Sequence, residues 1–445
     1  MVEPTIAGAL YTAESLLEGA VAFAKGITHP TLPLKANLSR ITDVPLPRSH
    51  HTLSVVKGRA YIFGGETSPG TLADNAMHIV ILPSSGVTTA DYTSIAARPM
   101  NTGGEVPQAR KGHTSVVIGD SIYIFGGEGV GDEMGRIWVY STTSNSWYSL
   151  DPASDSPCPS HRYGHAAAIS ELPPPRDEVV YRERAPQRPA DPAKVVPEPA
   201  DPDTWGTMFV VGGRSLTGEL MSDALAFDVR TRTWSNIPSP LGQPREGASM
   251  TIVGNKLYRF GGKGIETIAT GGLQAVDVSL VWKHAEDGTT PLTSGWAWEE
   301  VEHVEGEAPQ ARSGTGLESV TTGQGRHYLI ALGGEGEDGR FFDDIWAFQL
   351  PSERQTAAAA KDSTRSSVKA STNEGKWAEA KYEYLDSIGE EEKEIPGEPK
   401  HGLGIRGHFA VAKGTEVDGA SVIAWGGVDQ AGKILSDGWL VTVDR

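Results

Sequence analysis

The stretch SVVIGDSIYIFGGEG, residues 115–129, contains two short apolar runs that are separated by Gly119-Asp120 and followed by Gly126-Gly127. Both runs are rich in β-branched and aromatic residues, and each is too short to form a helix of its own. A Gly-Asp pair between two such runs indicates a hairpin turn, and glycine tolerates the positive φ of a sharp turn after the second strand. The stretch therefore predicts a β-hairpin that ends in a tight turn just before Glu128.

The same pattern recurs along the chain and constitutes a repeat. Each copy has an apolar segment upstream of Gly-Gly, usually preceded by Arg, and another apolar segment downstream. In most copies a further segment follows that carries Trp, such as Trp147 and Trp234. Four short strands per repeat are typical of propeller blades. The six copies are YIFGG (61–65), YIFGG (123–127), FVVGG (209–213), YRFGG (258–262), IALGG (330–334) and IAWGG (423–427).

The repeat resembles that of the kelch family of β-propellers. The shared features are Gly-Gly after the second strand, an Arg-x-Gly-His segment before the first strand, and a Trp about twenty residues beyond the glycines. The resemblance covers roughly residues 38–445 and implies an all-β fold, a six-bladed propeller of four-stranded blades like the central domain of galactose oxidase. The expected blades are roughly 45–100, 107–155, 160–240, 243–305, 309–385 and 403–445, the last completed by 37–43.

The N-terminal region is expected to contribute a helix and a closing strand. Residues 1–36 form a separate unit, in which 5–25 predict a helix that places its apolar residues on one face and stops at Gly26. The sixth repeat has no Trp-bearing strand of its own, and an extended segment at 37–42 precedes the first repeat. Pairing this segment with blade six would remove an open sheet edge, and kelch propellers commonly close in this way.

Four insertions interrupt the blades. Residues 171–204 are Pro-rich and charged, which predicts an extended or disordered loop on the face opposite the channel mouth, where the small polar segment 351–375 is also expected. The segments 263–272 and 384–404 should lie on the mouth side, so they are candidate lids or partner-contact loops.

Composition excludes several classes of partner. The formal net charge of −18 argues against non-specific binding to nucleic acid or to anionic lipid. The single cysteine, Cys158, forms no intramolecular disulfide and indicates a reducing compartment. No run of about 18 apolar residues occurs, and the start MVEPTIAGAL lacks the basic region of a secretory signal. A cytoplasmic location is the default expectation, with the nucleus as an open alternative.

The arginines before the first strands are the predicted ligand-binding residues. Loops that lead into strand one and out of strand two of a blade open on the same face, so these arginines should gather at one mouth of the channel. Guanidinium forks suit carboxylate and phosphate groups, and in the kelch family the matching arginines often meet acidic peptides or anionic small molecules. In blade six the matching position falls on Ile405, with Arg406 one residue out of register. The predicted set is Arg48, Arg110, Arg162, Arg245 and Arg312.

A structural function for the same arginines is an equally good interpretation. Glu66, Glu128 and Glu335 directly follow their Gly-Gly pairs and would pair with the arginines between blades. The third and fourth repeats carry Arg214 and Lys263 there instead. The arginines expected to keep a free charge are therefore Arg162 and Arg245.

Histidines and known enzymes of similar architecture give weaker signals. His51, His113, His165 and His408 are expected to begin strand one of four blades, too far apart to share a metal ion, and to fix blade packing. His50 is a candidate general base. The copper site of galactose oxidase has no counterpart around Cys158-Pro159, and the Glu-x3-Asp-x3-His iron motif of nitrile-specifier proteins fails at its third position, where Arg136 stands. Bacterial sialate mutarotases of kelch type use Arg, Glu and His, but no diagnostic match to them is present.

Two functions remain open at this level. The first is a non-catalytic module that binds an acidic peptide or protein partner through an arginine-lined channel mouth. The second is a small-molecule isomerase or lyase that acts on a carboxylate-bearing substrate in the same mouth, with Glu66, Glu128 and His50 as the catalytic candidates. In either case the partner is an acidic peptide or an anionic small molecule, not nucleic acid or membrane, and no metal or cofactor is expected.

Overall fold

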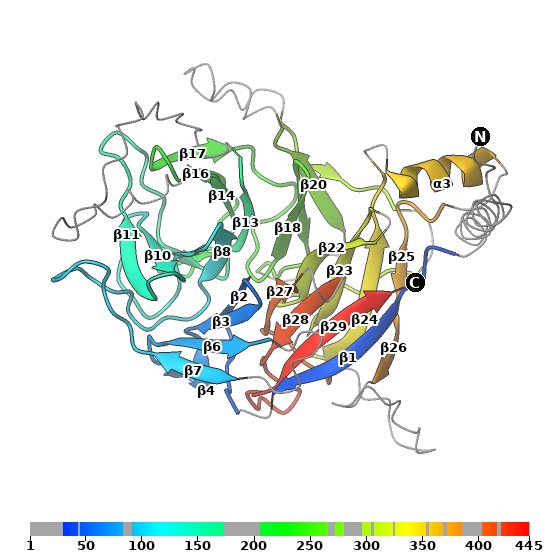
Figure 1. The fold of residues 1–445 in the computed structure, drawn as a ribbon. Helices are drawn as coiled ribbons and strands as arrows, with labels where there is room; N and C mark the ends of the chain where they lie inside the picture. Colours follow the sequence, from blue (N-terminus) through cyan, green and yellow to red (C-terminus); the bar gives the residue numbers. More distant parts are fainter. Residues whose placement is uncertain are drawn as a thin grey trace, which may run out of the picture.

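The fold is a six-bladed β-propeller built around a central channel (Figure 1). A computed structural model of the chain describes residues 30–42, 45–82, 91–172, 205–265, 272–279, 296–303, 307–323, 325–352, 356–367, 372–384, 403–415 and 420–444. The predicted helix at 5–25, the predicted loop over 173–204 and most of the segment 384–404 lie outside these residues.

Each blade is an antiparallel sheet whose strands follow the chain from the channel outward, as predicted. Blade one consists of β2(Thr52–Val56), β3(Arg59–Phe63), β6(Met77–Ile81) and β7(Tyr92–Ile95). Blade two consists of β8(Thr114–Ile118), β9(Ser121–Phe125), β10(Ile137–Ser141) and β11(Ser146–Leu150). Blade three consists of β13(Ala166–Ser170), β14(Thr207–Val211), β16(Ala224–Asp228) and β17(Thr233–Ile237). Blade four consists of β18(Ser249–Val253), β19(Lys256–Phe260), β20(Leu273–Asp277) and β21(Glu299–Glu300). Blade five consists of β22(Gly316–Thr322), β23(Arg326–Glu335), β24(Phe341–Gln349) and β25(Trp377–Glu379). Short ribbons β4(Glu66–Ser68) β5(Thr71–Leu72) and β12(Arg162–Tyr163) β15(Arg214–Ser215) lie beside them.

The sixth blade joins the two ends of the chain. Its strands β27(Ala410–Lys413), β28(Ser421–Trp425) and β29(Gly438–Asp444) are followed by β1(Lys35–Thr42), which pairs antiparallel with β29. Figure 1 shows the blue β1 beside the red β29. The predicted closing strand is thereby confirmed. A fifth strand, β26(Lys381–Tyr384), pairs parallel with the outer edge of β1 and was not predicted.

The first hairpin of blade two shows why Gly-Gly ends the second strand. β8 and β9 pair from Thr114↔Phe125 to Ile118↔Ser121, so Gly119-Asp120 form the turn. A Cβ atom on Gly126 would lie 2.4 Å from the carbonyl oxygen of Arg162 in the next blade. Both glycines also have positive φ values, 66° and 111°. The pair is needed because the neighbouring backbone leaves no room for side chains.

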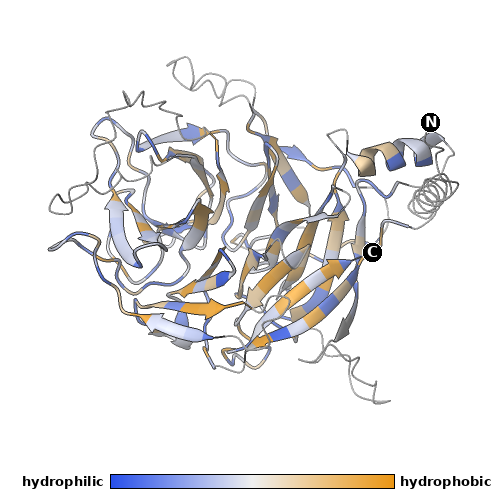
Figure 2. Ribbon diagram, in the orientation of Figure 1, coloured by the Kyte–Doolittle hydropathy of each residue, from blue (hydrophilic) through white to orange (hydrophobic). Residues whose placement is uncertain are grey.

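The core is formed between blades. Phe63 of blade one packs against Trp147 of blade two with ring centroids 5.0 Å apart, and Phe125 of blade two packs in the same way on Trp234 of blade three. The two Trp residues are 1% exposed. Figure 2 shows the hydrophobic residues concentrated in the strands and the hydrophilic ones in the loops. The Trp-bearing strands of blades two and three therefore each join their blade to the one before it.

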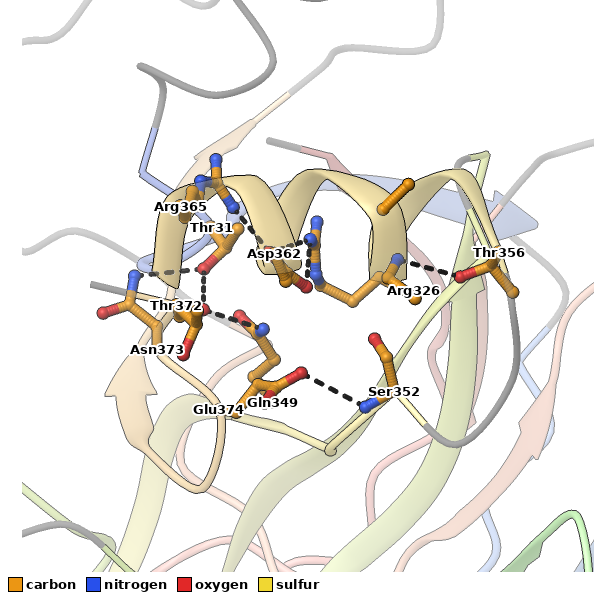
Figure 3. Close-up of polar contacts among 12 residues, drawn as sticks. Thr31, Arg326, Gln349, Ser352, Thr356, Asp362, Arg365, Thr372, Asn373 and Glu374 are labelled. Atoms are coloured by element: carbon orange, nitrogen blue, oxygen red, sulfur yellow. Dashed lines mark hydrogen bonds and ion pairs between the residues drawn. The ribbon is translucent and has the colours of Figure 1, made fainter. Parts of the chain in front are cut away.

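A helix stands where the sequence indicates only a small, polar insertion. α3(Ala357–Ser367) lies between β24 and β25 of blade five. Its Asp362 accepts hydrogen bonds on both carboxylate oxygens from Nη2 of Arg326 at 2.6 Å, and one from Arg365 at 3.0 Å. Figure 3 shows Arg326 and Asp362 directed toward one another beneath the helix. All three side chains are buried, so an ion-pair cluster fixes the helix to the blade.

Shortening Leu38 should weaken closure of the ring. Leu38 lies in β1, is 0% exposed and packs in the apolar cluster shared by blades five and six. Leu38→Ala should lower the free energy of unfolding by about 2–5 kcal/mol, because it removes buried apolar atoms and leaves a cavity. Urea denaturation measures this, with the exposed Lys35→Ala in the same strand as the control. Equal stabilities of the two variants would contradict the importance of β1.

Removing the Asp362 carboxylate should also be costly. In Asp362→Ala, Arg326 would stay buried at 0% exposure without a carboxylate, and breaking such a buried pair typically costs about 3–5 kcal/mol. The loss should appear in urea denaturation and as reduced hydrogen-exchange protection of α3. Ser363→Ala, on the exposed side of the same helix, serves as the control. A loss below about 1 kcal/mol would show that the ion pair does not hold the helix.

Candidate functional site

Six residues form a closed hydrogen-bonded ring at the channel mouth. Each backbone N–H donates to the carbonyl oxygen of the matching residue in the preceding blade, at distances between 2.8 and 3.1 Å. All six residues have positive φ values, in the left-handed region of the backbone. Four of them are glycines, and the ring positions of blades one and six are histidines. The members in order are His50, Gly112, Gly164, Gly247, Gly314 and His408. They surround a central space of about 140 Å³.

The histidines that begin the first strands lie one layer behind this ring. His113 and His165 hydrogen bond through Nε2 to the hydroxyls of Thr52 and Thr114 in the preceding blades, at 3.0 and 2.7 Å. Burial is the largest cause of their lowered pKa values, and a nearby arginine contributes. They therefore link neighbouring blades as neutral side chains, through threonine hydroxyls of the adjacent blade.

His408 is not the equivalent of these histidines, contrary to prediction. It belongs to the channel ring, and strand β27 begins later, at Ala410. Phe409 takes the inner position, because its Cβ lies where the Cβ of His165 lies in blade three, against the second glycine of the pair. The histidine of blade six occupies the ring position, which is glycine in four other blades, so matching it to His51 shifts the apparent register by one residue.

His50 and His408 stack at the junction of blades one and six. Their ring centroids are 4.4 Å apart with an interplanar angle of 18°. His408 Nε2 lies 3.2 Å from a carboxylate oxygen of Glu335, and His50 Nδ1 lies 3.4 Å from the Ser49 hydroxyl. Burial, followed by His408 and Lys111, lowers the pKa of His50 to about 3. At neutral pH His50 is an uncharged ring in the channel wall.

The predicted arginines lie within the blades and do not line the channel. All five are at most 9% exposed, and the residues that line the central space are histidines, glycines and small or apolar residues. Arg110 is representative, since its two Nη atoms bond the Glu133 carboxylate at 2.7 and 2.8 Å and Nη1 also donates to the Gly126 carbonyl at 3.0 Å. Ligand binding by the set stays a prediction, and these contacts argue for a structural function.

The acids that pair with the arginines are not those expected. Glu66 and Glu128 bond Lys111, and Glu335 bonds His408, whereas the actual partners stand before the third strand of their blade or, for Asp344, near its start. Arg162 is paired, contrary to expectation, and Arg406 takes the place assigned to Ile405. The pairs are Arg48 with Asp74 (3.8 Å), Arg110 with Glu133 (2.7 Å), Arg162 with Asp223 (2.7 Å), Arg312 with Asp344 (2.6 Å) and Arg406 with Asp437 (2.9 Å).

Arg245 differs from the other five. Its Nη atoms donate to the carbonyl oxygens of Gly261 at 3.1 Å and Leu241 at 3.3 Å. Within the part of the chain that the structure describes, it forms no ion pair. The expectation that Arg245 keeps its charge unpaired is met at this position.

The rim of the mouth carries charges of both signs. In each blade the residue after the arginine faces the residue after Gly-Gly, as Lys111 faces Glu128 and Glu246 faces Lys263. Lys111 also bonds Glu66 of blade one at 2.6 Å, and Arg214 bonds Glu246 of the next blade at 2.6 and 2.9 Å. Half-buried Tyr163 lies between these two groups, and its pKa is raised by burial and then by Glu128 and Glu246.

The catalytic candidates are only partly brought together. Glu66 and Glu128 both reach Lys111, which sequence reasoning did not select although it directly follows the predicted Arg110. His50 stacks on His408, and its pKa is lowered by burial, then by His408 and Lys111. The incomplete iron motif also disperses, since Arg136 pairs with Glu105 and Asp151. Among the described residues, no group of three or more His, Cys, Asp or Glu could hold a metal ion.

His50→Gly should flatten the pH dependence of stability. Because the folded-state pKa of His50 is about 3 and the ordinary value is 6.5, the unfolded chain takes up a proton first. His50 therefore contributes stability above about pH 6.5 that is lost as the pH falls toward 3. Glycine stands at this ring position in four blades and does not titrate. Urea denaturation between pH 7 and pH 4 should show a slope shallower by up to about 1.4 kcal/mol per pH unit.

The exposed His303→Gln is the control for this measurement and should keep the wild-type slope. A wild-type slope in His50→Gly would contradict the assignment of a neutral, half-buried imidazole at the ring.

Comparison with known proteins matches this geometry. Residues 35–172 and 201–373 match the family model described as KLHDC2/KLHL20/DRC7 Kelch-repeats domain. An F-box/kelch-repeat protein of Arabidopsis thaliana is 26% identical over 234 residues, which cover 50% of this chain and 41% of the relative. Acyl-CoA-binding domain-containing protein 4 of the same plant is 24% identical over 337 residues, 72% of this chain and 40% of the relative.

A plant enzyme and a solved structure are also similar. The N-(sulfonatooxy)prop-2-enimidothioate sulfolyase of Thlaspi arvense is 28% identical over 130 residues, 29% of this chain and 34% of the enzyme. The chain thus spans less than half the length of these three relatives. The solved structure titled "Structure of YjhT" superposes with a TM-score of 0.52 at 16% identity, covering 91% of this chain and 99% of that one, a likeness in fold alone.

Among the described residues, no helix has the length and apolar character needed to cross a membrane. The repeat pattern, the six blades and the match to the family model over most of the propeller lead to one conclusion: the chain belongs to the kelch-repeat family.

Proposed function

We propose that the protein is an interaction module that binds an acidic segment of a protein partner across the rim of the channel mouth. The size of the central space carries this proposal. At about 140 Å³ it is smaller than the 300–1,000 Å³ typical of pockets that enclose a small organic ligand. Recognition on the rim, where side chains of several blades are partly exposed, suits a peptide or protein surface better than an enclosed substrate.

Cationic side chains on blades two to four give the rim its preference for acids. Lys111 and Arg214 are 26% and 27% exposed, and Lys263 is exposed. The first two are held by Glu66 and Glu246, so a partner carboxylate would share or exchange these ion pairs. Such rim charges act mainly on the rate of association and on specificity. An acidic partner surface would meet these three cations within one arc of the mouth.

The alternative, a small-molecule isomerase or lyase, has less support. Its candidate acids Glu66 and Glu128 both bond Lys111, and His50 stacks on His408. The sulfolyase resemblance extends over 29% of this chain only. The paired acids favour binding over acid–base chemistry.

Partner capture with rim variants tests the proposal. Wild-type protein and the variants Lys263→Glu and Arg214→Gln would be used to enrich partners by chemical crosslinking, and the affinity of each recovered partner would then be measured. Reversing or removing a rim cation should weaken binding of an acidic partner about tenfold, the equivalent of about 1.4 kcal/mol. The binding of that partner should also weaken as the salt concentration rises.

Arg59→Glu is the matched control. Arg59 is exposed at the start of β3, next to the hairpin turn on the opposite face of the propeller, so it should leave the affinity unchanged. Equal binding by wild type and both rim variants, or a loss caused by Arg59→Glu, would place the interaction away from the mouth.

A further inference from the structure

Among the residues that the structure describes, blade four has no acid paired with its arginine, unlike the other five blades. In blades three and six this acid is the residue directly before the third strand, as Asp223 precedes β16 and Asp437 precedes β29, and in blade five Asp344 lies within β24 directly before Ile345, which pairs with Leu332. In blade four the residue directly before β20 is Gly272. Arg245 therefore keeps its contact with the Gly261 carbonyl, as Arg110 does with Gly126, but has no carboxylate ion-pair partner among the described residues.

The same blade has gained a second buried guanidinium group. Arg259 lies in the middle strand, where blades one and two have Ile62 and Ile124. It is 3% exposed, and its Nε is buried without a hydrogen-bond partner. The opposite residue in β20 is Gln274, where blade two has the indole of Trp138. Blade four thus replaces an apolar pair by a polar one beside an arginine that has lost its acid.

Arg245 and Arg259 act on one another electrostatically. Burial, followed by the charge of Arg245, lowers the pKa of Arg259 to about 9, so both remain cationic at neutral pH. Glu300 raises the pKa of both, but its carboxylate accepts a hydrogen bond from Gln274 at 2.7 Å and forms no ion pair with either arginine. Two buried cations without a counterion are unfavourable, and such unsatisfied groups are rare in folded proteins.

We propose that Arg245 and Arg259 form a carboxylate-binding site, in which a ligand carboxylate takes the place of the acid that Gly272 does not supply. The five acids at this position in the other blades have side chains between 18% and 62% exposed, so the place lies at the surface and is accessible. Guanidinium forks match a carboxylate with parallel N–H···O bonds. Where this carboxylate belongs to the acidic segment of a partner, the inference rests on the function proposed above.

Acetate is the probe that tests the site on the full chain. Thermal unfolding and titration calorimetry would compare sodium acetate with sodium chloride at equal ionic strength. A ligand that binds only the folded state raises the melting temperature. Acetate should therefore raise the Tm of the wild type above the chloride value, and a saturable heat of binding should accompany the shift.

Two variants distinguish the site from a general salt effect. Gly272→Asp supplies the missing carboxylate from the chain itself, so the Tm in chloride should rise and acetate binding should weaken at least tenfold. Arg259→Ile restores the residue of blades one and two, so it should abolish the acetate shift while folding at least as stably as the wild type in chloride. The second variant keeps the test valid if Gly272→Asp does not fold.

Absence of a shift specific to acetate, or an equal shift in both variants, would overturn the site. A larger effect of inorganic phosphate than of acetate would overturn its assignment to carboxylates. These outcomes are independent of partner capture, because they are measured on the isolated protein. If Arg259→Ile captures an acidic partner more weakly than the wild type does, the ligand carboxylate comes from the partner. If capture by Arg259→Ile is unchanged while the wild type still binds acetate, the site takes a free carboxylate.

Discussion

A backbone hydrogen bond between neighbouring blades is the interaction on which the rest of this structure depends. The second glycine of each Gly-Gly pair donates its N–H to the carbonyl oxygen of the arginine in the next blade, in all six blades, at distances between 2.8 and 3.1 Å. Gly427 of blade six donates to Arg48 of blade one and closes the circle. The contact requires two backbones to lie against each other, so a Cβ atom at these glycines would clash.

This contact explains why the repeat contains an arginine as well as two glycines. The arginine carbonyl accepts from the preceding blade, while its guanidinium group donates to the carbonyl of the first glycine in its own blade, as Arg110 does to Gly126. One residue thus joins the ends of two hairpins, and an acid such as Glu133 balances its buried charge. A ring of arginines that suggests an anion-binding mouth is mainly a device for blade assembly.

Individual character arises where the repeat departs from this scheme. At the junction of blades one and six, His50 and His408 replace the glycines of the channel ring and stack on one another. In blade four, Gly272 replaces an acid, and Arg259 replaces an aliphatic residue. In the other five blades a carboxylate pairs with the arginine, and this comparison identifies the missing ion pair of Arg245 in blade four. Residues that follow the repeat build the propeller, and residues that depart from it are the candidates for function.

The sequence by itself determined the propeller, the number of blades and the closing strand, because Gly-Gly, Arg and Trp recur at spacings that local geometry enforces in every copy. It did not determine which charges meet. Glu133 lies in a loop whose length differs between blades, and Glu66 belongs to the neighbouring blade, so linear spacing does not reveal that Glu133 pairs with Arg110 and Glu66 with Lys111. Register failed at Arg406 because His408 occupies the ring position and not the place of His51, so counting back from it leads to Ile405. Pairing of charges depends on distances in space, and only the tertiary structure decides them.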